Sequence, residues 1–202
     1  MKFRLPALIT ALIVIGTGCY SGPNRRVTAV DPNTATHLTG KWNDTDSNAT
    51  AKVMMRACLN SAWYAKFKAK HNRNPRIKLY TIRNRTSQHV QTKFFTKKVE
   101  EELLNSGNVG VVSASDETEA ARREKDDQSK HASDATKKEH RQEKGADFLL
   151  NGWIVLSTER SGGTSSRAYM VTMELTSVEG QEKTWTKTHN VKKMIQQSET
   201  SW

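Results

Sequence analysis

The sequence predicts an α/β (α+β) fold, a mixed β-sheet of about four to five strands with a C-terminal antiparallel meander, covered by helices. Two observations lead to this prediction. Helix-like and strand-like segments alternate in the first half of the chain, and three strand-like segments separated by tight turns follow residue 147. The chain has 202 residues, of which 35% are hydrophobic, which suits a single domain with some additional tail.

The N-terminal segment, residues 1–18, is predicted to be a secretory signal peptide. Lys2 and Arg4 give it a positive start, and the apolar run from Leu5 to Ile15 contains 11 residues. A membrane-spanning helix needs roughly 20 apolar residues, so this run is too short to remain as a span. The alternative, a buried N-terminal strand or helix, is less favoured because the run lies at the extreme terminus behind two positive charges.

Cys19 follows a set of small residues that resembles the bacterial lipoprotein box. The match covers Thr17, Gly18 and Cys19, while Gly16 stands where Leu, Val or Ile is usual. The resemblance implies cleavage before Cys19 and attachment of lipid to that residue, and several acyl chains together anchor a protein stably. Tyr20 stands where Asp would retain an enterobacterial lipoprotein at the inner membrane, which implies an outer-membrane protein that faces the periplasm.

The net charge of +11 favours an anionic partner. Cleavage after residue 18 removes two basic and no acidic residues, which lowers the charge from +11 to +9. A protein anchored outside the cytoplasm does not meet chromosomal DNA, so nucleic acid is not an expected partner. Peptidoglycan, acidic lipid headgroups and an acidic patch on another protein stay open.

Four segments are expected along the chain. Residues 1–18 form the signal peptide, residues 19–39 a short polar tether, residues 40–193 a single domain, and residues 194–202 a polar tail. The tether is rich in turn-forming residues and shows no apolar period.

The domain begins with a helical stripe that starts at a cap on Asp46 or Ser47 and ends before Pro75. A strand from Ile77 to Ile82 follows, and it leads into a polar loop, Arg83–Ser87. The next helix closes at Gly107, a residue suited to a left-handed helix end. Its apolar face is expected to contain Phe94, Phe95, Val99, Leu103 and Leu104.

The second half of the domain starts after a short strand, VGVVSA, with the most charged region of the chain. Charges of opposite sign at i, i+4 between Asp116 and Lys144 predict two exposed helices with a break near residues 129–133, the second being the better supported. Three consecutive strands then follow at Phe148–Thr158, Arg167–Val178 and Thr184–Val191. The turns between them, at Gly162-Gly163 and at residues 179–181, predict an antiparallel meander.

No catalytic motif, metal site or cofactor site is visible in the sequence. None of the six histidines lies at ligand spacing from another, and neither a P-loop nor a G-x-G-x-x-G or G-x-S-x-G motif is present. Cys58 falls on an apolar helix face, where a buried thiol is favoured over a nucleophile or an intermolecular disulfide. The sequence therefore predicts a binding or regulatory protein and not an enzyme.

Residues 76–114 resemble the lipoprotein activators of penicillin-binding proteins, the LpoB family. The family pattern is a strand that ends in an Asn-Arg-Thr/Ser loop, then a helix, then a strand, and it stands here as Asn84-Arg85-Thr86, Ser106-Gly107 and Val111-Val112. The stretch GADFLLNGWI resembles the family's next strand, and MELTSVEGQEKTWTKTHNVKK resembles its closing hairpin. The likeness covers most of residues 38–193.

The resemblance implies an outer-membrane lipoprotein whose domain is akin to the amino-terminal domain of TolB. It implies a partner, a bifunctional class A penicillin-binding protein whose activities in peptidoglycan synthesis the lipoprotein stimulates. The alternative is a structural or assembly lipoprotein, related by fold to TolB or CsgG, with no role in wall synthesis. The tether here is shorter and poorer in proline than in the well-known members.

The expected partner-binding residues are Arg83, Asn84, Arg85 and Thr86. Arginine is enriched at the centres of protein contacts, so Arg83 and Arg85 are candidates for direct contact as much as for a structural role. Asn84 is expected to shape the turn through hydrogen bonds to nearby backbone.

Overall fold

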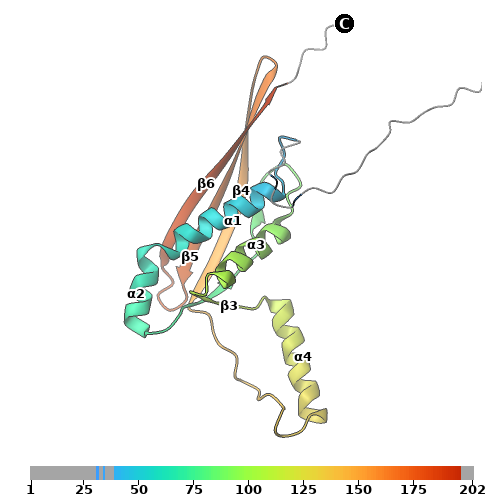
Figure 1. The fold of residues 1–202 in the computed structure, drawn as a ribbon, viewed down its shortest axis with the longest axis vertical. Helices are drawn as coiled ribbons and strands as arrows, with labels where there is room; N and C mark the ends of the chain where they lie inside the picture. The colour runs from blue at the N-terminus through green and yellow to red at the C-terminus, as the bar shows by residue number, and fades with distance from the viewer. Residues whose placement is uncertain (1–30, 32–33, 35–38, 197–202) are drawn as a thin grey trace, which may run out of the picture. The chain divides into compact units, whose positions relative to one another are not determined.

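The structure, a computed structural model, describes residues 31, 34 and 39–196. Four helices and six strands lie in this part of the chain (Figure 1). They are α1 (Asp44–Leu59), α2 (Ala62–His71), β1 (Arg76–Leu79), β2 (Arg83–Asn84), α3 (Thr92–Asn105), β3 (Gly110–Val112), α4 (Ser115–His131), β4 (Phe148–Ser161), β5 (Thr164–Ser177) and β6 (Lys183–Gln196). The predicted signal peptide and Cys19 lie outside the described residues.

The strands form one mixed sheet, as the sequence predicts, with the order β3-β1-β4-β5-β6. The short strands β1 and β2 follow one another along the same edge of β4 and pair with it in parallel. The long strands β4, β5 and β6 pair antiparallel, which confirms the C-terminal meander. The sheet has six strands because β2, a two-residue strand, lies where a loop was predicted.

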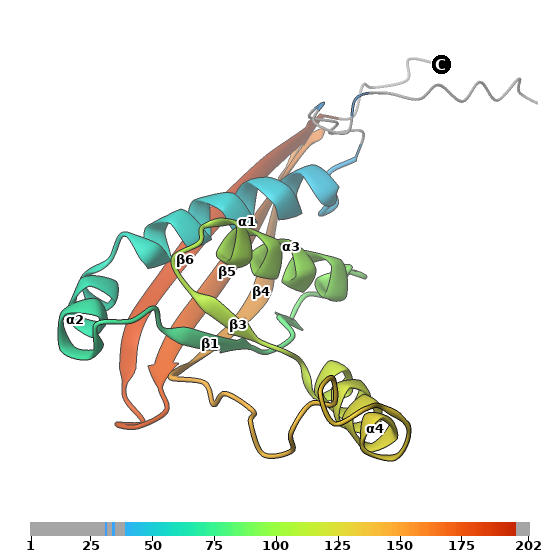
Figure 2. The same cartoon turned by 60° about the horizontal axis from the view of Figure 1, so that its bottom comes forward.

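Helices α1 and α3 both lie on one face of the sheet (Figure 2). Strand positions that face these helices are fully buried, among them Leu150 and Ile154 on β4, and Val171 and Leu175 on β5. The positions between them on both strands are only partly buried. The sheet therefore has a helix-covered face, which forms the core, and an open face.

The first helix begins earlier than the sequence predicts, because Asn43 and not Asp46 or Ser47 is its N-cap. The Asn43 side chain accepts a hydrogen bond from the Asp46 backbone N–H, and Asp46 accepts one in return from the Asn43 N–H. This is a capping box, which satisfies two otherwise unpaired donors. The predicted single helix also divides at Asn60, where the Trp63 indole N–H donates to the carbonyl oxygen of Cys58.

Helix α3 packs with a narrower face than its sequence suggests. Phe95, Val99 and Leu103 are buried at a spacing of four residues, whereas Phe94 and Leu104 remain 40% and 50% exposed. The helix ends as predicted at Gly107, which adopts a left-handed φ of 65° and donates to the carbonyl oxygen of Leu104.

The charged region forms one helix and not two, and the helix is the half that the sequence supports less well. Helix α4 covers residues 115–131, and residues 132–147 contain only turns and irregular backbone. Lys97 of α3 pairs with Glu117 at the start of α4 over 2.6 Å, so the first half is attached to the packed helices. Neither half contains a large apolar side chain, and alternating charges alone do not hold an isolated helix, so the charge pattern does not distinguish the two halves.

No helix in the described part of the chain is long and apolar enough to cross a membrane. Strand β6 continues to Gln196, beyond the predicted end of the domain at residue 193.

Candidate partner-binding site

The Arg83–Gln88 loop, defined as residues 83–88, begins with strand β2 and leads to the segment before α3. Its first two residues pair with Trp153 and Ile154 of β4. The backbone N–H of Arg85 then donates to the carbonyl oxygen of Ile154 over 2.8 Å. The loop is therefore fixed to the centre of the sheet at its start.

Asn84 and Thr86 shape this loop from within. The Asn84 side-chain amide donates to the carbonyl oxygen of Gln88, and its Oδ1 accepts from the backbone N–H of Thr86. The Thr86 hydroxyl accepts from the Gln88 N–H over 3.1 Å. These are the local hydrogen bonds that asparagine and threonine make in turns, and they confirm the turn-shaping role expected for Asn84.

Gln88 anchors the end of the loop to the core. Its Oε1 accepts a hydrogen bond of 2.6 Å from the hydroxyl of Tyr169, a fully buried residue of β5. The Tyr169 ring makes an edge contact with Trp42 at 5.5 Å between centroids. Burial raises the pKa of the Tyr169 hydroxyl, so the hydroxyl keeps its proton and stays a donor near neutral pH.

Arg83 and Arg85 project from the open face of the sheet. Arg83 lies opposite Trp153 in the β2–β4 register, and directly paired residues share a face. The guanidinium carbon of Arg85 lies 5.1 Å from the Trp153 ring centroid, within the range of a cation–π contact. Both arginines are exposed, and neither makes an ion pair with any residue that the structure describes.

The open face continues from this arginine–tryptophan cluster across the three long strands. Its partly buried positions on β4 and β5 alternate with the core positions, and the register places exposed polar residues of β6 beside them. The face includes Leu149, Trp153, Val155, Met170, Thr172, Thr188, Asn190 and Lys192. Apolar and aromatic side chains with a rim of polar and basic ones are typical of protein contact surfaces.

The sequence did not identify Trp153 or Met170 as surface residues. Trp153 lies in a strand whose apolar residues occupy both alternating sets of positions, so the pattern there does not reveal which set faces the helices. In β5 the alternation of Tyr169, Val171, Met173 and Leu175 with mostly polar positions does predict the buried set, and Met170 is an apolar residue in the other set. The interruption of the apolar pattern in β6, where Thr188 and Asn190 flank His189, was the available signal for an open face.

The described residues hold no group of three or more His, Cys, Asp or Glu side chains that could bind a metal ion. Cys58 is completely buried on α1, and this burial raises the pKa of its thiol to about 12. The thiolate is the reactive form of cysteine. Near neutral pH the thiol of Cys58 is therefore protonated and unreactive, and it contributes to the core as a buried side chain. The geometry of the arginine–tryptophan cluster supports binding through a surface.

The family profile described as "Peptidoglycan-synthase activator LpoB" matches residues 46–191. This match spans more than half of the chain, and it includes the Arg83–Gln88 loop, both packed helices and most of the meander. The chain belongs to the LpoB family, whose members are regulatory activators.

Similar solved structures include two domains from the same family. The LpoB C-terminal domain from Escherichia coli is 17% identical, with a TM-score of 0.45, over 72% of this chain and 98% of that one. The LpoB C-terminal domain from Salmonella enterica is 16% identical, with the same TM-score and coverage. Lipoprotein GNA1162 from Neisseria meningitidis is 11% identical, with a TM-score of 0.40, over 62% of this chain and 88% of that one. A comparison with curated proteins finds no match.

Proposed function

We propose that this protein is a lipid-anchored protein of the outer membrane that faces the periplasm and binds and stimulates a bifunctional class A penicillin-binding protein in peptidoglycan synthesis. The observation that carries the proposal is the family match over residues 46–191. The proposed anchor is Cys19, and the proposed contact residues are Arg83 and Arg85, positioned by Asn84 and Thr86.

The open face supports this role physically. Arginine and tryptophan dominate the energetics of many protein contacts, and here Arg85 lies over Trp153. The loop that carries both arginines is held by Asn84 and Gln88, so little conformational freedom is lost when a partner binds. A rigid, exposed cationic cluster suits an acidic surface on the synthase.

The proposed tether limits where the contact takes place. Residues 19–39 span at most about 70 Å when fully extended, and far less as a coil. The synthase must therefore reach close to the outer membrane for both proteins to meet.

The test measures binding of the whole chain, purified in detergent, to class A penicillin-binding proteins of the same cell. The pair Arg83→Gln and Arg85→Gln is expected to weaken binding by at least about tenfold and to reduce stimulation of glycan polymerisation in parallel. The matched control is Arg123→Gln with Lys130→Gln, which removes the same charge from exposed positions on α4. Failure of the unchanged protein to bind any such synthase would refute the proposal, and stable capture of other outer-membrane proteins without any effect on wall synthesis would favour an assembly role.

The anchor has a separate test. Cells that express the Cys19→Ser variant are labelled with a radioactive fatty acid, and the labelled lipoprotein is expected to disappear while the protein remains detectable with an antibody. Persistence of the label in the variant would show that the lipid is not attached to Cys19.

A further inference from the structure

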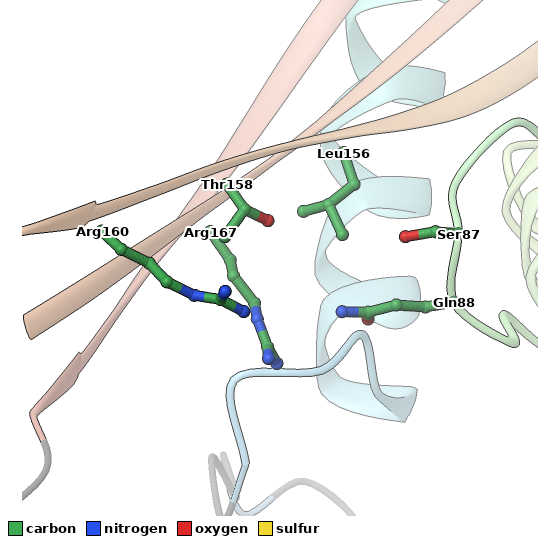
Figure 3. A pocket seen from close by; sticks show the side chains of 6 residues that line it. All are labelled: Ser87, Gln88, Leu156, Thr158, Arg160 and Arg167. Carbon is green, nitrogen blue, oxygen red and sulfur yellow. The ribbon is translucent and has the colours of Figure 1, made fainter.

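A cavity of about 370 Å³ lies beside the Arg83–Gln88 loop, on the helix-facing side of the β4–β5 hairpin (Figure 3). Its side chains come from the end of the loop and from the two strands. They are Ser87, Gln88, Leu156, Thr158, Arg160 and Arg167. Every one of the polar side chains can donate hydrogen bonds, and none of them is a carboxylate.

Two arginines point into this cavity from neighbouring strands. Arg167 of β5 lies opposite Thr158 of β4, and Arg160 is two residues further along the same face. Figure 3 shows both guanidinium groups directed to the same side of the cavity. Neither arginine makes an ion pair within the described ranges of the chain.

The local charges leave Arg167 without compensation. Its direct neighbour on β6 is another cation, Lys193, and like charges at paired positions destabilise a sheet. Lys193 is neutralised by Asp46, with 2.5 Å between Nζ and Oδ2. No carboxylate remains for Arg167 or Arg160, so the cavity carries two positive charges without a counter-charge among the described residues.

The amide of Gln88 is orientated as a third donor. The Tyr169 hydroxyl lies 2.6 Å from Gln88 Oε1 and 3.1 Å from the carbonyl oxygen of Gly40. The Nε2 group of Gln88 has no hydrogen-bond partner among the described residues, and it faces the arginines in Figure 3. The hydroxyls of Ser87, from the loop side, and of Thr158, from the strand side, also line the cavity (Figure 3). Leu156 contributes an apolar surface against which a short methylene stem can pack.

We propose that this cavity binds the carboxylate of an aspartate or glutamate side chain that the penicillin-binding protein inserts beside the Arg83–Gln88 loop, an inference that rests on the proposed function. A carboxylate matches the planar, forked donors of two guanidinium groups. The cavity is contiguous with the proposed contact loop through Ser87 and Gln88. It lies on the helix-facing side of the sheet, so a partner engages both the cavity and the arginines of the open face by reaching around the Arg83–Gln88 loop.

The experiment compares binding of the whole chain and its variants to the class A penicillin-binding protein by calorimetry. Arg160→Gln with Arg167→Gln is expected to weaken binding by about tenfold or more, since charge-assisted contacts of this kind control dissociation. Arg160→Lys with Arg167→Lys keeps the charge but loses the fork, so an intermediate loss is expected. Arg123→Gln with Lys130→Gln on α4 is again the matched control and is expected to bind normally.

A second variant tests the cavity without removing an arginine. Thr158→Glu places a carboxylate in the cavity, where it pairs with the guanidinium groups of Arg160 and Arg167. Because the partner's carboxylate then finds no unpaired guanidinium group, this variant is expected to weaken binding as much as the double glutamine variant. Far-ultraviolet circular dichroism checks that each variant is folded. If Arg160→Gln with Arg167→Gln is not folded, the outcome is decided by Thr158→Glu, which changes an exposed position.

The partner side is tested by a double-mutant cycle. Acidic residues on the synthase are changed to amides one at a time, and one such change is expected to lose its effect when combined with Arg160→Gln and Arg167→Gln. If the unchanged protein binds and the cavity variants bind like the α4 control, this inference fails while the proposed function stands. If the unchanged protein binds no synthase, the proposed function itself has failed.

Discussion

Two ion pairs in this protein have the same chemistry but opposite surroundings. Lys193 of β6 pairs with Asp46 of α1, and their side chains are only 9% and 2% exposed. Arg122 of α4 pairs with Glu143 over 2.8 Å, and both of these side chains are largely in solvent. The first pair connects residues at the two ends of the domain. The second connects α4 with the irregular segment that follows it in the charged region.

The buried pair acts as a clasp between the first helix and the last strand. Besides Asp46, Lys193 donates to the carbonyl oxygen of Lys41 over 2.8 Å, and Asp46 also accepts from the backbone N–H of Asn43. Loss of either partner leaves an unpaired charge in a largely buried site. The exposed pair on α4 is screened by solvent, and its formation costs the conformational entropy of two long side chains. Burial, and not the number of charges, therefore determines how much an ion pair contributes to stability.

The largest expected effect is on the clasp. Lys193→Met leaves Asp46 buried without its partner and is expected to lower the free energy of unfolding by about 3–5 kcal/mol, measured by urea denaturation. The double variant Lys193→Met with Asp46→Asn is expected to be more stable than the single variant, because no charge is then stranded. Equal stability of the two variants would mean that the buried charge is not the cause.

The same clasp can be examined without denaturant through the buried thiol of Cys58. At pH 8 the native protein is expected to react very slowly with iodoacetamide, because burial raises the pKa of Cys58 to about 12 and the thiolate is the reactive form. Labelling then requires opening of the core, so Lys193→Met is expected to accelerate it by about a hundredfold or more. An unchanged labelling rate in that variant would mean that the Lys193–Asp46 pair does not stabilise the packing around α1.

A smaller effect is expected at Asp147, which lies between the two extremes. Its carboxylate accepts two hydrogen bonds from Arg73, at 2.7 and 2.8 Å, and one from the backbone N–H of Arg76. The Arg73 guanidinium, followed by this backbone N–H, holds the pKa of Asp147 below its usual value. Asp147→Asn is expected to lower the free energy of unfolding by about 1–2 kcal/mol at neutral pH.

The pH dependence of this effect has a definite sign. Because the carboxyl group has a lower pKa in the folded protein, the unfolded chain binds the proton more readily. The contribution of Asp147 is therefore present above its unfolded pKa of about 3.9 and is lost as the pH falls through its lowered pKa in the folded protein. The urea midpoints of the parent and of Asp147→Asn are expected to converge as the pH falls through this range, while parallel curves would contradict the assignment.

The smallest effect is expected on the exposed pair. Arg122→Gln and Glu143→Gln, alone or together, are expected to leave the urea midpoint of the domain unchanged at physiological salt. The fold of the sheet and of α1 does not depend on this contact. A clear loss of stability in these variants would mean that the exposed pair, like the buried one, contributes to the stability of the domain.

The sequence predicted the local features of the fold, because their causes lie within a few residues. Alternating polarity and glycine turns define the meander, the residues of α3 show helical spacing, and Gly107 ends that helix with a left-handed φ. The turn at Asn84 follows from hydrogen bonds that reach no further than Gln88. Each of these features is decided by backbone geometry and short-range contacts.

The failures of prediction have local as well as distant causes. The N-cap of α1 is Asn43, and Asp46 is the N3 residue of its capping box, a signal contained in four neighbouring residues. The pairing of Asp46 with Lys193 is a distant contact that the local pattern does not reveal. In the charged region both halves carry the pattern of an exposed helix, and this pattern does not reveal that only residues 115–131 form one.

The functional surface divides in the same way. The sequence by itself identified the Arg83–Thr86 loop and its turn, along with the pattern that the family profile matches over residues 46–191. Only the tertiary structure placed Arg85 over Trp153 and brought Gln88 beside Arg160 and Arg167. Those neighbours belong to strands far along the chain, and the register of the sheet, set by the burial of one face against α1 and α3, decides which side chains meet.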